Sequence, residues 1–209
     1  MPALSAAFYF DLASPLAYLA AERILHVGRN SIPIEWQPVL ARELGASAEP
    51  FSAFRCENEE DIFHAEIERR AQAQGLGPLK WPNPFPFDSA LAMRVATYAK
   101  SIGRTVPFVQ AAFRQAFAGG HNLEQIDFVL IAAAACEMHP AAVLKGAELR
   151  SVGEQLSRTT ALAAQAGVTD VPAVRIGDRV FVGEHAVEDA ATQAEETMNP
   201  GNAGGTQTQ

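Results

Sequence analysis

The 209-residue sequence predicts an α/β protein in which a helical segment interrupts a small β-sheet. β-rich runs lie near both ends of the chain, at residues 8–12 and 32–39 and again at 171–182, whereas residues 41–138 carry almost no β pattern. The order is strand, helix, strand, several helices, then helix, two strands and a helix. A helix between the first two strands favours a right-handed βαβ unit with parallel strands, so we expect a mixed four-stranded sheet.

The first element is a strand followed by a tight turn and a helix. Residues 8–12 form a short apolar and aromatic run, typical of a central strand. Pro15 suits the first position of a helix, where an N–H would have no partner, and apolar residues then recur with a period of 3.6. Ser14 therefore lies at a helix N-terminus, whose free N–H groups favour a nearby anion or thiolate. The alternative is that Ser14 is only an N-cap.

The middle of the chain is expected to be helical. Residues 32–39 alternate apolar and polar side chains and predict the second strand, which its prolines restrict to its ends or to an edge. Helices are then predicted at residues 61–74, 88–102, 106–117 and 123–138. Residues 81–87 form an aromatic loop whose prolines exclude regular structure.

The β pattern returns near the end of the chain. After a predicted helix at 151–166, residues 171–176 and 179–182 indicate a hairpin, because the intervening Gly177-Asp178 suits a tight turn. A last helix is expected at 185–198, and the polar tail 199–209 is expected to be disordered. The predicted domains are residues 1–40 with 146–198, forming one discontinuous unit, an all-helical insertion at 41–145, and the tail.

Composition excludes several classes of function. The net charge of −8, the pI near 5.1 and the lack of a basic cluster argue against a nucleic-acid partner. No apolar run reaches the ~18 residues of a membrane span, and the N-terminus lacks the basic region of a secretory signal. Cys56 and Cys136 form no CxxC motif, and the scattered histidines lack metal-ligand spacing. A cytoplasmic protein without a metal is expected.

Several motifs follow one another in the order and spacing of a known family. They are residues 8–19, Trp81-Pro82 with Phe85-Pro86, Ser89 with Ala92 and Arg94, residues 113–117, and Gly167-Val168 followed by Val171-Pro172. This series resembles 2-hydroxychromene-2-carboxylate isomerases and kappa-class glutathione transferases. The resemblance implies a thioredoxin fold with an inserted all-helical domain, the DsbA-like arrangement.

The resemblance also implies a thiol site. It makes Val171-Pro172 a cis peptide bond that exposes the Val171 backbone, which in glutathione-binding relatives pairs with the cysteinyl unit of the tripeptide. Ser14 stands where dithiol relatives place the first cysteine, so disulfide exchange is excluded there. A serine hydroxyl can instead donate to the sulfur of bound glutathione.

Two positions depart from the family pattern. Residues 43–50 contain no asparagine, although relatives use one there to contact glutathione. After the last strand, where relatives present an acidic residue to the γ-glutamyl ammonium, this chain has Glu184 and His185. Both are therefore assigned to cofactor binding. Another low-molecular-weight thiol, or no thiol, remains an alternative to glutathione.

The remaining predicted site residues concern the substrate. Trp81 and Phe85 are expected to line an apolar pocket for a small aromatic substrate, and Arg94 to pair with its carboxylate, a plain salt bridge being the alternative. Asp11 is interpreted as structural, with direct involvement as the alternative. The activity implied is a glutathione-dependent isomerisation; the alternatives are a kappa-like transferase or peroxidase and a non-catalytic binding protein. The oligomeric state stays open, with a homodimer among the assemblies allowed.

Overall fold

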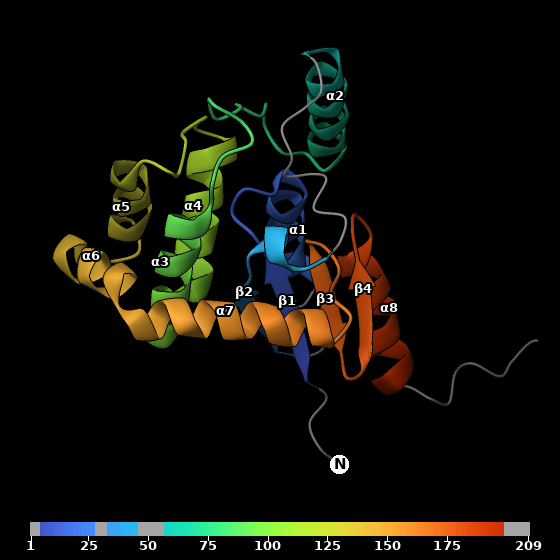
Figure 1. Cartoon of the computed structure of the whole chain (residues 1–209). Helices are drawn as coiled ribbons and strands as arrows, with labels where there is room; N and C mark the ends of the chain where they lie inside the picture. The colour runs from blue at the N-terminus through green and yellow to red at the C-terminus, as the bar shows by residue number, and fades with distance from the viewer. Residues whose placement is uncertain (1–4, 28–32, 46–56, 199–209) are drawn as a thin grey trace, which may run out of the picture.

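The computed structural model describes residues 5–27, 33–45 and 57–198, and Figure 1 shows how their helices and strands are arranged. Four strands form one sheet in the order β2-β1-β3-β4. They are β1 at Ala6–Phe10, β2 at Ile34–Pro38, β3 at Ala173–Ile176 and β4 at Arg179–Val182. β1 is parallel to β2 and antiparallel to β3, which is antiparallel to β4. The predicted mixed four-stranded sheet is confirmed.

The end of β1 and the start of β3 differ from the bounds that the sequence predicts. β1 ends at Phe10 instead of residue 12, because the carboxylate of Asp11 accepts the N–H of Ala13 and turns the chain. β3 begins at Ala173 instead of residue 171, after Pro172, which has no N–H to donate to a neighbouring strand.

The helices account for most of the remaining described residues. They are α1 at Pro15–Val27, α2 at Glu57–Ala73, α3 at Ala90–Ser101, α4 at Thr105–Phe117, α5 at Ile126–Ala134, α6 at Pro140–Glu148, α7 at Arg150–Gln165 and α8 at Ala186–Met198, together with a short 3-10 helix, η2, at Ala41–Glu43. Helices α2 to α5 lie within the predicted insertion at 41–145, and α6 crosses its end. The domain boundaries stay a prediction, and the tail 199–209 lies outside the described residues.

The prediction of a single helix over residues 123–138 is wrong at its C-terminal end. α5 stops at Ala134 and the chain reverses: Glu137 adopts φ 60°, and the N–H of Met138 donates to the carbonyl of Ala133. A separate helix, α6, follows, with His139 as its N-cap and Pro140 in its first turn. This cap is a start signal that the apolar periodicity of the preceding segment conceals.

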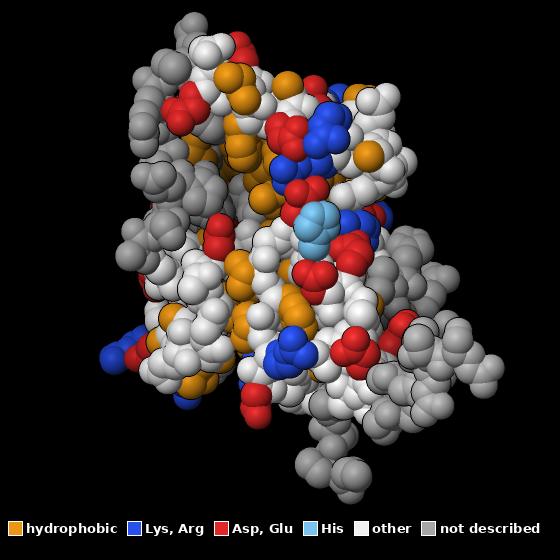
Figure 2. Space-filling model, turned by 90° about the vertical axis from the view of Figure 1, so that its right-hand side faces the viewer, with side chains coloured by type: hydrophobic (Ala, Val, Ile, Leu, Met, Phe, Trp, Pro, Cys, Tyr) orange, Lys and Arg blue, Asp and Glu red, His pale blue; other side chains and the backbone are white. Residues whose placement is uncertain are grey.

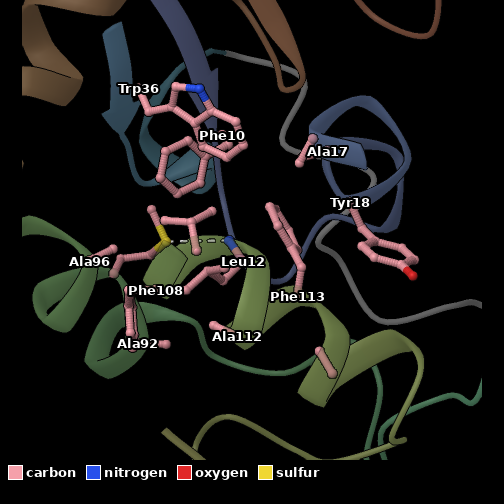
Figure 3. Packing of buried hydrophobic residues seen from close by; sticks show 14 of the residues in the cluster. Phe10, Leu12, Ala17, Tyr18, Trp36, Ala92, Ala96, Phe108, Ala112 and Phe113 are labelled. Atoms are coloured by element: carbon pink, nitrogen blue, oxygen red, sulfur yellow. Dashed lines mark hydrogen bonds between the residues drawn. The ribbon is translucent and has the colours of Figure 1, made fainter. Parts of the chain in front are cut away.

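The two faces of the sheet carry different layers. Phe8 and Phe10 of β1 are fully buried and pack against Trp36 of β2, with ring centroids 5.0 and 5.9 Å away. Figure 3 shows this cluster continuing into Phe113 of α4. On the opposite face, Tyr9 belongs to a second buried cluster that includes residues of α7, and Figure 1 shows α7 crossing that face of the sheet.

Candidate active site

The turn between β1 and α1 is fixed by Asp11. Its Oδ1 accepts the N–H of Ala13 and its Oδ2 the N–H of Ala41 in η2, both at 3.0 Å, and its carbonyl accepts the N–H of Ser14. The residue is 2% exposed, and burial raises the pKa of its carboxyl although the bonds from Ala13, Ser89 and Ala41 lower it. The turn that carries Ser14 is therefore joined to the segment after β2.

Ser14 lies at the N-terminus of α1, as the sequence predicts. Its Oγ accepts the N–H of Ala17 at 3.1 Å, so the predicted N-cap is present. A hydroxyl that accepts one bond still has a hydrogen to donate. No described residue accepts that hydrogen, although Ser14 is only 4% exposed. The N-cap and a hydrogen bond to a bound sulfur are thus compatible.

The loop before β3 has the predicted cis bond at Val171-Pro172. Its Val171 N–H is already engaged, however, because it donates to Oδ1 of Asp170 at 2.7 Å, and Val171 is 3% exposed. A ligand that pairs with this N–H must therefore displace the Asp170 carboxylate. Burial raises the pKa of Asp170, against the bond from Val171, which lowers it. Sequence reasoning missed Asp170, although a carboxylate two residues before the proline is a visible signal.

Glu184 and His185 follow β4 as expected, but Glu184 has partners. Its Oε2 lies 2.8 Å from Nη1 of Arg70 in α2, and its carbonyl accepts a bond from Arg23 in α1, which also pairs with Glu188 in α8. Figure 2 shows basic and acidic side chains interspersed on the side of the molecule where α2, β4 and α8 lie. His185 is exposed. A ligand ammonium at Glu184 must therefore compete with Arg70.

Trp81 and Phe85 pack together, in an aromatic cluster between α2 and α4. The Trp81 ring stacks on His64 with centroids 3.7 Å apart and meets Phe85 edge-on at 5.1 Å, and its Nε1 donates to Glu68. Both rings also contact Phe117 of α4. The loop is therefore apolar, as predicted, but much of its aromatic surface is turned to the protein's own helices.

Arg94 of α3 is held by backbone carbonyls. Its guanidinium donates to the carbonyl oxygens of Ala147 and Leu149, at the end of α6. The first bond serves a carbonyl in the last turn of α6, where a helix leaves carbonyls without helical partners, whereas the Leu149 carbonyl also accepts the N–H groups of Val152 and Gly153. No described carboxylate pairs with Arg94, so the alternative salt bridge is not found in the described part of the chain, and the substrate contact stays a prediction.

A polar pocket of 210 Å³ lies beside the Ser14 turn, and it holds a residue that sequence reasoning missed. It is lined by Asp11, Arg42, Pro86, Phe87, Asp88 and Ser89. Arg42 of η2 brings a cation to this end of the sheet. The loop that supplies Pro86 and Phe87 is the one that the sequence analysis assigned to substrate.

Two further properties concern the described part of the chain only. No cluster of three or more histidine, cysteine, aspartate or glutamate residues there is suited to hold a metal ion. None of the described helices is both long and apolar enough to cross a membrane.

Comparison with known proteins points to one family. A model described as a DSBA-like thioredoxin domain matches residues 6–194. A 2-hydroxychromene-2-carboxylate isomerase structure is similar at TM-score 0.81 and 17% identity, over 93% of this chain and 96% of that chain. A probable DsbA oxidoreductase from Streptomyces coelicolor gives TM-score 0.71 and 16% identity, over 98% and 94% of the chains.

A third similar structure holds a thiol. The cytosolic disulfide reductase DsbM from Pseudomonas aeruginosa, solved with GSH, gives TM-score 0.65 and 14% identity, over 94% of this chain and 100% of that chain. No curated protein matches the sequence. At these identities the three structures show a common fold.

Proposed function

The chain belongs to the family of DSBA-like thioredoxin domains, and from this premise we propose that it is a cytoplasmic, glutathione-dependent isomerase of the 2-hydroxychromene-2-carboxylate type. The observation that carries the proposal is Ser14. Ser14 occupies the start of α1, and no described residue accepts its hydroxyl hydrogen. The cis Val171-Pro172 bond directly precedes β3, the strand that pairs with β1 ahead of the Ser14 turn. A serine forms no disulfide, so the site is suited to hold a thiol rather than to oxidise one.

The residues at this site fit a thiol such as glutathione. Ser14 would donate its hydroxyl hydrogen to the sulfur, and the free N–H groups at the start of α1 would favour the thiolate. The Val171 backbone would pair with the peptide, and Glu184 and His185 would meet its amino end. When bound, the thiol supplies a nucleophile that adds to a conjugated carbon of the substrate and leaves once a bond has rotated. The protein then contributes position and electrostatics.

Two alternatives use the same fold differently. A kappa-like glutathione transferase or peroxidase would hold the thiol at Ser14 in the same way but would act on small electrophiles or peroxides. A non-catalytic DsbA-like protein would use the cis-proline loop to bind a peptide or a partner. In each case, a ligand that pairs with the Val171 N–H must displace the Asp170 carboxylate.

The test combines thiol binding with turnover. Calorimetry with glutathione, cysteine and coenzyme A identifies the thiol, and absorbance follows the isomerisation of 2-hydroxychromene-2-carboxylate with and without it. Saturable, thiol-dependent isomerisation supports the proposal. Conjugation of 1-chloro-2,4-dinitrobenzene without isomerisation identifies a transferase. A chain that binds no thiol and turns over neither compound overturns both the isomerase and the transferase.

A further inference from the structure

The pocket beside the Ser14 turn has an uneven lining. Pro86 and Phe87 supply apolar surface, whereas Asp11, Ser89, Asp88 and Arg42 supply polar groups from three separate segments. Its 210 Å³ is less than the ~300–1,000 Å³ of clefts that bind drug-sized ligands. A pocket of this size and lining suits a compact molecule with one apolar ring and two adjacent polar groups.

Arg42 is available to an anionic ligand. Its Nη1 lies 2.8 Å from Oδ1 of Asp88, and the side chains are 49% and 56% exposed. An ion pair as exposed as this contributes little to stability, so a ligand can replace it at low cost. In the described part of the chain, the other guanidinium nitrogens of Arg42 have no hydrogen-bond partner. A guanidinium with free parallel N–H groups matches the two oxygens of a carboxylate.

Asp11 has room for one more hydrogen-bond donor. It accepts from the N–H groups of Ala13 and Ala41 and from the side chain of Ser89. Because the two carboxylate oxygens together offer about four acceptor sites, one site remains. Asp11 is buried and lines the pocket, so a ligand hydroxyl is the donor that fits there.

We propose that this pocket binds a small aromatic 2-hydroxy acid, with the carboxylate on Arg42, the hydroxyl on Asp11 and the ring against Phe87 and Pro86. The assignment rests on the proposed function, because the Asp11 carbonyl accepts the Ser14 N–H and so places the pocket beside the thiol site. Arg42, instead of Arg94, is then the residue that recognises the substrate carboxylate.

The test measures binding without turnover. Mandelate is an unreactive one-ring 2-hydroxy acid, and calorimetry of the full chain without thiol gives its affinity. We expect Arg42→Gln to weaken binding by roughly 10- to 100-fold, as for a lost bond to a charged group, and Arg42→Lys to restore part of it. Arg150→Gln is the matched control, because Arg150 is a 92% exposed arginine that also pairs with one carboxylate. Phenylacetate, which lacks the hydroxyl, should bind about 10-fold more weakly than mandelate.

A second variant should strengthen binding. Asp88→Asn removes the charge that competes for Arg42 while keeping an oxygen for the N–H of Ala90, so mandelate affinity should rise several-fold. Wild-type protein that does not bind mandelate, or equal affinities in Arg42→Gln and wild type, overturns the pocket assignment. Binding that depends on Arg42 in a protein without thiol-dependent turnover leaves the pocket assignment standing and refutes the proposed function. Thiol-dependent turnover with an unchanged KM in Arg42→Gln refutes the pocket assignment and leaves the proposed function standing.

Discussion

The backbone N–H of Leu12 donates a hydrogen bond to the thioether sulfur of Met93, 3.3 Å away (Figure 3). Both residues are fully buried, so the bond joins the turn after β1 to α3 of the helical layer without access to water. A thioether is a weak acceptor, yet in the structure it is the partner of this buried donor. The position of the Ser14 turn therefore depends on a side chain from the helical segment.

Met93→Leu tests this dependence. The substitution conserves volume but leaves the Leu12 N–H without an acceptor, so the free energy of unfolding should fall by ~1–3 kcal/mol. Met138→Leu is the control, because Met138 is also buried and no described residue donates to its sulfur. Urea denaturation of both variants measures the difference. Equal losses would mean that packing, and not the hydrogen bond, accounts for the effect.

Asp170 should make stability depend on pH. Its carboxyl titrates near 3.8 in an unfolded chain, and burial raises its pKa in the folded protein. The protonated form therefore stabilises the fold below pH 3.8, and this contribution is lost as pH rises through the raised pKa. Asp170→Asn keeps an oxygen for the Val171 N–H and does not titrate.

Comparison with Asp170→Asn shows in which direction Asp170 changes the unfolding free energy as pH rises. Between pH 3 and 7 the unfolding free energy of wild type should decline relative to that of the variant. The same comparison with Asp178→Asn, at the exposed hairpin turn, controls for the general effect of removing a carboxylate. A difference between wild type and Asp170→Asn that stays constant over this range would show that the burial of Asp170 has no consequence for folding.

Arg70 should set the affinity for a ligand with a free amino group. In the structure Arg70 forms an ion pair with the Glu184 carboxylate. Arg70→Gln should therefore free that carboxylate to bind an ammonium and raise the affinity for glutathione several-fold. N-acetylcysteine, which lacks a free amine, should bind both proteins equally. Arg150→Gln, which removes an arginine that pairs with Glu154, serves as control. Weaker glutathione binding in Arg70→Gln would mean that Arg70 itself contacts the thiol.

Features that depend on the order of helices and strands can be predicted from the sequence. Side-chain contacts with residues far away in the chain are harder to predict. The place of Ser14 at the start of α1 follows from local signals, and the cis Val171-Pro172 bond follows from the family resemblance; both are confirmed. The engagement of Glu184 and Arg94 could not be predicted. Their partners lie in α2 and at the end of α6, and a charged side chain shows its function only once its neighbours are known.

The same reason explains why the pocket was missed. Arg42 stands in a short 3-10 helix without periodicity, and its neighbours Asp11 and Phe87 come from two other segments of the chain. Asp11 carried a visible signal, since an acid that ends an apolar strand must find donors. Its direct partners, Ala13, Ala41 and Ser89, agree with the structural interpretation, and the direct involvement that the sequence left as an alternative is part of the proposed pocket.

The last prediction is that Ser14 acts on a bound thiol and is not itself the nucleophile. A serine nucleophile needs a base within hydrogen-bond reach, and among the described residues the Ser14 hydroxyl accepts from Ala17 and has no histidine partner. Ser14→Ala should therefore raise the pKa of the bound thiol and slow turnover by roughly 10²-fold, as when one donor to a developing anion is lost. Ser151→Ala, at an exposed position in α7, controls for handling of the variant. Mass spectrometry of wild type incubated with substrate and no thiol should find no adduct, and a covalent adduct on Ser14 would refute the thiol mechanism.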